Sequence, residues 1–274
     1  MVNRKVLWIW RYDGHEKTVQ EHVDASGADT ICLNTITHQF KETMDYYQQK
    51  MNKTVWAWRW PGTKPADGYG WHYFIRDQAA YVSTLIKSGL QGFIVDPESN
   101  ENKKPNDWAQ DEVDGNKLKD LATEFWTTLK GAAKGKNVLF GMTSGNTFPA
   151  QESKKLIPWS EFAAPCQALY PQSYWRAWSL DKQTKKEIVK DLYPTPDDAI
   201  DAGLKAWQKL GAGKKIIPMA GEIELATKEE IASYAARMAK LNLNELHFYV
   251  DNFYENDNHH GVLADTLQAI KAIQ

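Results

Sequence analysis

The sequence is poor in the residues that build disulfide frameworks and metal centres. Only two of its 274 residues are cysteine, Cys32 and Cys166, too few for a disulfide scaffold or a thiolate zinc site. The seven histidines form no His-x-His and no His-Glu-x-x-His motif, which argues against a metal hydrolase. We therefore expect no metal and no cofactor, and we expect both thiols to be buried in strands.

The chain also lacks an excess of positive charge and any long hydrophobic run. Its 33 lysines and arginines against 35 aspartates and glutamates give a net charge of −2, so we expect no nucleic-acid partner. No apolar run approaches the roughly 20 residues that cross a bilayer, so we expect no membrane insertion. The first residues show no secretory signal, which predicts a cytoplasmic protein, or one released by lysis or a specialised route.

Two common glycine motifs are missing as well. The segment after the first predicted strand, 10–15, has a single glycine where a dinucleotide-binding sheet needs three. No Gly-x-Ser-x-Gly elbow is present, which argues against a serine hydrolase. These absences leave the alternation of apolar runs and helical patterns as the main guide to the fold.

Eight short, β-rich apolar runs predict parallel strands that are covered on both faces. They are 6–10, 30–34, 54–60, 92–95, 138–142, 166–170, 215–219 and 245–250. Amphipathic patterns predict helices between them, and Thr227 with Glu230 forms a capping box at the start of one. Eight strand–helix units in strict alternation predict one α/β domain over 1–274, a monomeric (β/α)₈ TIM barrel.

The active site of such a barrel lies at the carboxyl ends of its strands, so we expect the reactive side chains there. The fourth strand ends Asp96-Pro-Glu98. Residues two apart in an extended strand project to the same side, so both carboxylates can face the barrel mouth. Two carboxyls this close cannot easily both ionise, and one pKa should rise. A carboxylic acid that stays protonated is what glycosidic bond cleavage requires.

Twelve tryptophans are the most unusual feature of the composition. An indole offers a flat apolar surface with one N–H donor and stacks well on the C–H face of a sugar ring. Trp8 and Trp56 lie deep in their strands, where we expect core packing. Trp10, Trp60 and Trp175 lie at strand ends, where we expect exposure in a cleft. Further candidate substrate-binding residues at strand ends are Arg11, Asn34, Trp58, Tyr170, Gln172, Tyr174 and Asp251.

The Asp-x-Glu that closes strand four and the segment 169–175 that closes strand six resemble retaining glycoside hydrolases. The nearest are family-25 lysozyme-like muramidases and, more loosely, family-18 chitinase-like enzymes. The resemblance implies that Glu98 is the general acid/base and that Asp96 orients a substrate N-acetyl group, which Tyr170 and Gln172 contact. It implies hydrolysis of an N-acetylated polysaccharide, with peptidoglycan preferred over chitin.

Three alternatives stay open at this stage. Glu222, at the end of strand seven, is the position of the nucleophile in many retaining barrel glycosidases, with Glu98 as the acid/base. Trp10 and Arg11 stand where family-25 enzymes carry an acidic residue, which favours a carbohydrate-binding barrel without catalysis. A structural or assembly component would neither bind nor cleave sugar.

Overall fold

The computed structural model describes residues 2–64, 73–98, 108, 115–181, 183–184, 186–251 and 261–274. Eight strands form one sheet in the order β10-β1-β2-β3-β4-β5-β6-β9, and every neighbouring pair is parallel. These strands are β1 Arg4–Ile9, β2 Thr30–Asn34, β3 Thr54–Arg59, β4 Gly92–Val95, β5 Leu139–Gly145, β6 Ala168–Gln172, β9 Lys215–Ile216 and β10 Glu245–Val250.

The sheet closes on itself between the seventh and eighth strand positions. β9 is regular for only two residues, although Ile217 and Met219, on either side of Pro218, still donate to the carbonyls of Leu169 and Pro171 at 2.8 Å. Beyond the proline, Ala220 pairs in parallel with Phe248, and its N–H donates to the carbonyl of His247 at 3.0 Å. The predicted (β/α)₈ TIM barrel of the α/β class is therefore confirmed.

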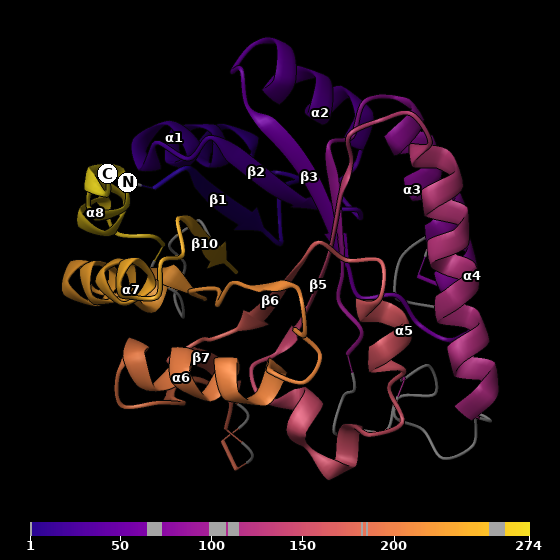
Figure 1. The fold of residues 1–274 in the computed structure, drawn as a ribbon. Helices are drawn as coiled ribbons and strands as arrows, with labels where there is room; N and C mark the ends of the chain where they lie inside the picture. Colours follow the sequence, from indigo (N-terminus) through magenta and orange to yellow (C-terminus); the bar gives the residue numbers. More distant parts are fainter. Residues whose placement is uncertain are drawn as a thin grey trace.

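Helices surround the sheet on its outer side, and the two termini lie next to each other (Figure 1). The helices are α1 Glu16–Ser26, α2 Phe40–Gln49, α3 Ile75–Lys87, α4 Gly115–Ala133, α5 Trp159–Ala163, α6 Pro196–Trp207, α7 Lys228–Lys240 and α8 Ala264–Ala272. The capping box at α7 is confirmed, because the Thr227 side chain accepts from the Glu230 N–H and the Glu230 side chain accepts from the Thr227 N–H. Among the helices that the structure describes, none has the length and apolar character needed to cross a bilayer.

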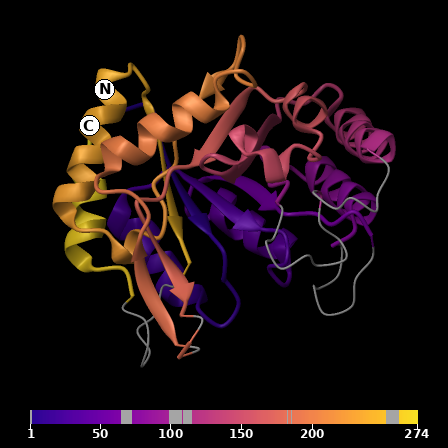
Figure 2. The ribbon, with the colours of Figure 1, turned by 90° about the horizontal axis from the view of Figure 1, so that it is seen from below.

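One hairpin interrupts the alternation of strands and helices. β7 (Arg176–Leu180) and β8 (Glu187–Asp191) pair antiparallel between β6 and α6. In Figure 2 this orange hairpin projects away from the barrel. Every residue of β8 is exposed, and the hairpin was not predicted from the sequence.

The inside of the barrel is aromatic rather than aliphatic. Trp8, Trp56, Tyr170 and His247 are all buried, and the Tyr170 and His247 rings have centroids 4.4 Å apart. Core packing is thus confirmed for Trp8 and Trp56. Cys32 and Cys166 are also buried, as predicted, although Cys166 precedes β6 and does not lie in a strand, and burial raises the pKa of both thiols.

Candidate functional site

A cavity of about 210 Å³ opens at the carboxyl ends of the barrel strands. Its lining comes from seven of the eight strand positions, either from residues of the strands or from the residues just beyond them. The lining residues are Trp8, Trp10, Trp58, Trp60, Asp96, Glu98, Thr143, Gln172, Tyr174, Met219, Glu222 and Tyr249. The three candidate catalytic carboxyls and five of the ten candidate substrate-binding residues are in this set.

One side of the cavity is a wall of tryptophans from β1 and β3. The Trp10 and Trp60 rings stack in parallel, with centroids 4.2 Å apart and planes 2° apart. The Arg59 guanidinium lies 4.4 Å from the centroid of the Trp60 ring. Because Trp10 covers one face of the Trp60 ring, the guanidinium covers the other face. A ligand can therefore meet Trp60 at its edge, whereas its faces are already occupied.

Trp58 connects this wall to a second aromatic pair. Its ring lies 5.8 Å from Trp10 and 6.1 Å from Tyr249, and its indole N–H donates to the carbonyl of Ile9. Tyr249 in turn stacks on Tyr174, with centroids 5.4 Å apart and planes 13° apart. The aromatic side of the cavity thus runs without interruption from β3 through β1 and β10 to the end of β6.

The acidic side of the cavity begins at the end of β4. Asp96 is only 1% exposed, and its Oδ2 accepts a hydrogen bond from the Gln172 side-chain amide at 3.1 Å. Burial and the neighbouring Glu98 carboxyl raise the pKa of Asp96 well above its usual range, although the Gln172 amide opposes the shift. Glu98 is exposed at the cavity wall. Ionisation of both carboxyls of the pair at once is therefore disfavoured.

Glu222 faces the same cavity from the seventh strand position. Its backbone is left-handed (φ 49°, ψ 55°), a conformation that costs free energy for a residue with a side chain. Its Oε2 accepts a hydrogen bond from the backbone N–H of Trp178 in the β7–β8 hairpin. Burial, together with the charges of Glu224 and Asp251, raises the pKa of Glu222 to about 9 despite that bond. Its carboxyl is thus protonated at neutral pH.

The Tyr174 hydroxyl lies within electrostatic range of all these acids. Burial and the carboxyls of Glu222, Asp96, Glu98 and Asp251 together raise the pKa of Tyr174 well above its usual value. The phenol therefore remains a hydrogen-bond donor across the physiological pH range. This single side chain links the acid pair on β4 to Glu222 and completes the ring of polar groups.

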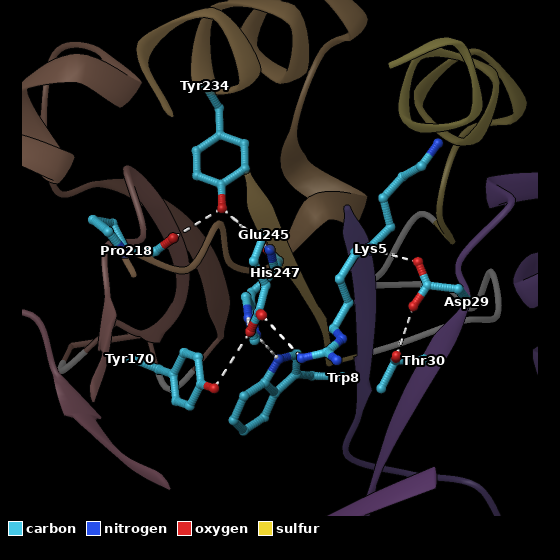
Figure 3. A network of polar contacts seen from close by, with 10 residues as sticks. Lys5, Trp8, Asp29, Thr30, Tyr170, Pro218, Tyr234, Glu245 and His247 are labelled. Atoms are coloured by element: carbon cyan, nitrogen blue, oxygen red, sulfur yellow. Dashed lines mark hydrogen bonds and ion pairs between the residues drawn. The ribbon is translucent and has the colours of Figure 1, made fainter. Parts of the chain in front are cut away.

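A chain of polar contacts holds the cavity floor from below (Figure 3). The Trp8 indole N–H donates to Nδ1 of His247 at 2.8 Å, which leaves Nε2 of His247 to carry the proton that faces Glu245, 2.8 Å away. Glu245 also pairs with Arg4 at 3.0 Å, and the Tyr170 hydroxyl points toward it. Burial lowers the pKa of His247 although Glu245 opposes this, so the neutral imidazole is the form that the network holds.

Five candidate substrate-binding residues do not line the cavity. Arg11 is exposed outside it. Asn34 is buried and its Oδ1 accepts from the Ile36 N–H at 3.1 Å. Tyr170 faces the barrel interior like Gln172 but lies one layer deeper, against His247. Asp251 lies just outside the lining and accepts from the Tyr249 hydroxyl at 3.2 Å.

The prediction for Trp175 is wrong. Exposure in the cleft was predicted for it, but it is only 2% exposed and its ring lies 6.3 Å from that of Tyr234 on α7. Its carbonyl accepts the N–H groups of Leu192 and Tyr193, which close the base of the β7–β8 hairpin. The turn into the unpredicted hairpin therefore directs this side chain under α7 instead of into the cavity.

Four lining residues were not among the sequence-based candidates: Trp8, Thr143, Met219 and Tyr249. Thr143 and Tyr249 do lie near predicted strand ends, so their position was a signal that could have included them. Trp8 is both a core residue and part of the cavity floor. Because it lies deep in β1, the sequence predicted only its packing in the core. Met219 follows Pro218, where the strand is irregular and its end is hard to assign from sequence.

Within the described ranges, no group of three or more His, Cys, Asp or Glu side chains has an arrangement that could hold a metal ion. The cavity lining offers carboxyl, amide, phenol and indole groups. Such a set suits proton transfer next to an apolar, ring-shaped ligand.

No protein-family model matches the sequence, and no curated protein matches it. Solved structures do match. The family-26 endo-β-1,4-mannanase catalytic domain from Bacillus sp. JAMB-750 aligns at a TM-score of 0.59 and 12% identity, over 98% of this chain and 85% of its own. The PgaB glycoside hydrolase domain from Bordetella bronchiseptica aligns at a TM-score of 0.54 and 8% identity, over 90% of this chain and 93% of its own.

The likeness is not restricted to glycoside hydrolases. Orotidine 5′-monophosphate decarboxylase from Methanocaldococcus jannaschii aligns at a TM-score of 0.50 and 12% identity, over 100% of this chain and 99% of its own. At identities this low, the comparisons show the barrel fold that all of these proteins share. The function has to be argued from the cavity itself.

Proposed function

We propose that this protein is a glycoside hydrolase that cleaves an N-acetylated polysaccharide, with peptidoglycan preferred over chitin. The observation that carries the proposal is the convergence of Asp96, Glu98 and Gln172 with a continuous aromatic wall around one cavity. Aromatic surface next to carboxyls suits a sugar, which offers C–H faces to the rings and hydroxyl groups to the acids. A phosphorylated ligand would call for glycine-rich or arginine-rich loops instead.

In this proposal Glu98 is the general acid/base. It is the exposed member of the acid pair and can reach the oxygen of a glycosidic bond held in the cavity. Asp96 is almost completely buried, which suits a residue that orients the substrate N-acetyl group rather than one that attacks carbon. Gln172 holds Asp96 in place through the amide hydrogen bond.

The reaction then proceeds in two steps. Glu98 donates its proton to the leaving oxygen while the carbonyl oxygen of the substrate's own N-acetyl group attacks the anomeric carbon. Asp96 orients the acetamido group through a hydrogen bond while positive charge develops on that group. Glu98, now ionised, removes a proton from water, which opens the cyclic intermediate with overall retention of configuration.

Glu222 has a different role under this mechanism. A nucleophilic carboxylate must be ionised, but burial raises the pKa of Glu222 to about 9, so the protonated form dominates at neutral pH. A protonated Glu222 serves better as a hydrogen-bond donor to a sugar hydroxyl or carbonyl. This difference separates the proposed mechanism from direct displacement by Glu222 with Glu98 as the acid/base.

The test combines a reducing-end assay on peptidoglycan and chito-oligosaccharides with calorimetric titration of the same oligosaccharides. We expect turnover by the wild type, loss of turnover with retained binding in Glu98→Gln, and partial loss in Glu222→Gln. Glu21→Gln, which alters an exposed carboxyl on α1, is the matched control and should behave as wild type. Binding without product would identify a non-catalytic carbohydrate-binding barrel, and full activity in Glu98→Gln would refute the assignment.

A further inference from the structure

The base of the β7–β8 hairpin passes directly beside Glu222. The N–H of Trp178, on β7, donates to the Glu222 carboxyl, so part of the cavity wall is held by a backbone group of an inserted element. Two residues earlier, Arg176 begins β7 and lies on the same face of that strand. Its side chain spans from the hairpin to the segment that follows Glu222.

Arg176 makes hydrogen bonds to three different partners. Its Nη1 and Nη2 form a bidentate pair with the Glu230 carboxylate at 2.9 and 2.6 Å, and Nη1 also donates to the carbonyl of Leu225 at 3.0 Å. Its Nε donates to Asp191 of β8 at 2.9 Å. The guanidinium therefore joins both strands of the hairpin to the chain between Glu222 and α7.

The partners of Arg176 are themselves fixed. Glu230 is the acidic member of the capping box at the start of α7, and it also accepts the N–H of Thr227. Leu225 ends the short 3₁₀ helix Ile223–Leu225, which begins immediately after Glu222. The Arg176 side chain is 29% exposed and that of Glu230 is 18% exposed, so the pair is partly shielded from water.

We propose that Arg176 is a positioning residue that fixes the Glu222 carboxyl on the cavity wall. It acts from two sides: it holds the hairpin that supplies the Trp178 N–H, and it holds the turn on which Glu222 adopts its left-handed backbone. The contribution to turnover rests on the proposed function, whereas the contribution to the geometry of Glu222 does not.

The fork of a guanidinium is required for this role. A bidentate pair with a carboxylate and a third bond to a carbonyl need several donors in a fixed plane, which the single ammonium of lysine cannot supply. Lysine would keep the charge but not the geometry. The contact with Asp191 is less important, because that carboxylate is 77% exposed and such surface pairs contribute little.

The experiment follows the backbone amide of Trp178 by NMR as pH is raised, with no substrate present. In the wild type this amide should shift as Glu222 ionises, because a hydrogen bond to a carboxylate moves the amide resonance downfield. The other groups that influence Glu222 are Glu224 and Asp251, so Glu222→Gln is titrated in parallel to assign the transition.

We expect Arg176→Gln to lose most of the pH-dependent shift of the Trp178 amide and Arg176→Lys to keep an intermediate part. Arg237→Gln is the matched control, because it breaks the ion pair between Arg237 on α7 and Asp201 on α6 and should leave the shift unchanged. A wild-type shift in both Arg176 variants would overturn the proposal. If Arg176→Gln does not fold, the lysine variant alone decides between the two outcomes.

Turnover is measured separately on the same variants. If the wild type cleaves, Arg176→Lys should lower kcat more than it changes KM, since the carboxyl is displaced while the aromatic wall remains intact. If the wild type does not cleave, the proposed function fails, but the amide titration still tests the positioning role.

Discussion

The rings of Trp10 and Trp60 lie parallel at 4.2 Å, and the Arg59 guanidinium covers the face of Trp60 that Trp10 leaves open. Trp60 is therefore held between two partners and serves as a rigid wall. Trp10 has one face against Trp60 and its edge toward Trp58. A cavity built in this way keeps its shape when it is empty, which lowers the entropic cost of binding a ligand.

The first prediction concerns this stack. In a double-mutant cycle, Trp10→Ala and Trp60→Ala should show a coupling free energy of unfolding of about 0.5–1.5 kcal/mol, the range for aromatic pairs beyond area burial. Urea unfolding of the four proteins measures it. A cycle of Trp60 with Trp126, which packs on Phe140, should show coupling near zero. Equal coupling in both cycles would contradict the predicted interaction.

The second prediction concerns Gly221, which precedes Glu222. A Cβ atom at this position would lie 1.8 Å from the Tyr174 ring, so Gly221→Ala must displace a side chain of the cavity wall. We expect a loss of about 1–3 kcal/mol in the free energy of unfolding, together with weaker oligosaccharide binding. Gly131→Ala on α4 meets no atom within 4 Å and should instead stabilise by about 0.5–1 kcal/mol. Unchanged stability in Gly221→Ala would show that Tyr174 adjusts without cost.

The third prediction is a pH dependence of stability. The pKa of Glu222 is about 9 in the folded protein and close to 4.5 when unfolded, so between these values only the folded state keeps the proton. The stabilisation is complete below about pH 4.5 and is lost as pH rises toward 9. Relative to Glu222→Gln, the wild type should therefore lose stability, at most by about 1.4 kcal/mol per pH unit. Chemical denaturation from pH 5 to 9 measures this, and parallel curves would refute it.

The fourth prediction concerns the cavity floor. Trp8→Phe keeps most of the packing but removes the N–H that donates to His247, leaving a buried acceptor without its donor. We expect a loss of about 1–3 kcal/mol in the free energy of unfolding. Trp126→Phe is the control, because the Trp126 indole N–H is buried without a hydrogen-bond partner in the described part of the chain, and its removal should cost much less. Equal losses in the two variants would assign the effect to packing alone.

The fold could be predicted because buried parallel strands are short, apolar and regularly spaced. The seventh strand was located correctly, although its regular part is limited to Lys215 and Ile216. The β7–β8 hairpin could not be predicted, because its second strand is exposed on both faces and therefore has no alternation of apolar and polar residues. An apolar and polar alternation in the sequence predicts a strand only where one face of that strand is buried.

The site was predictable to the extent that strand ends determine it. Asp96, Glu98 and Glu222 were chosen by their positions after strands four and seven, and all three line the cavity. A place near the end of a strand does not indicate how deep in the barrel a side chain lies. Tyr170 was therefore predicted, like Gln172, to bind substrate, although it lies one layer deeper. Arg176 escaped notice because its partners, Leu225 and Glu230, are some fifty residues away in the sequence and meet it only in the folded chain.

Among the described strands, the junction between β9 and β10 has the fewest paired residues in the barrel. Beyond Pro218, it depends on two backbone hydrogen bonds, from Ala220 to His247 and from Tyr249 to Ala220, and on the Tyr234 hydroxyl that bonds the Pro218 carbonyl. Glu222 stands two residues past Ala220. We expect local opening of the barrel to begin at this junction, where the fewest hydrogen bonds must break, so the distance of Glu222 from the opposite wall should change first.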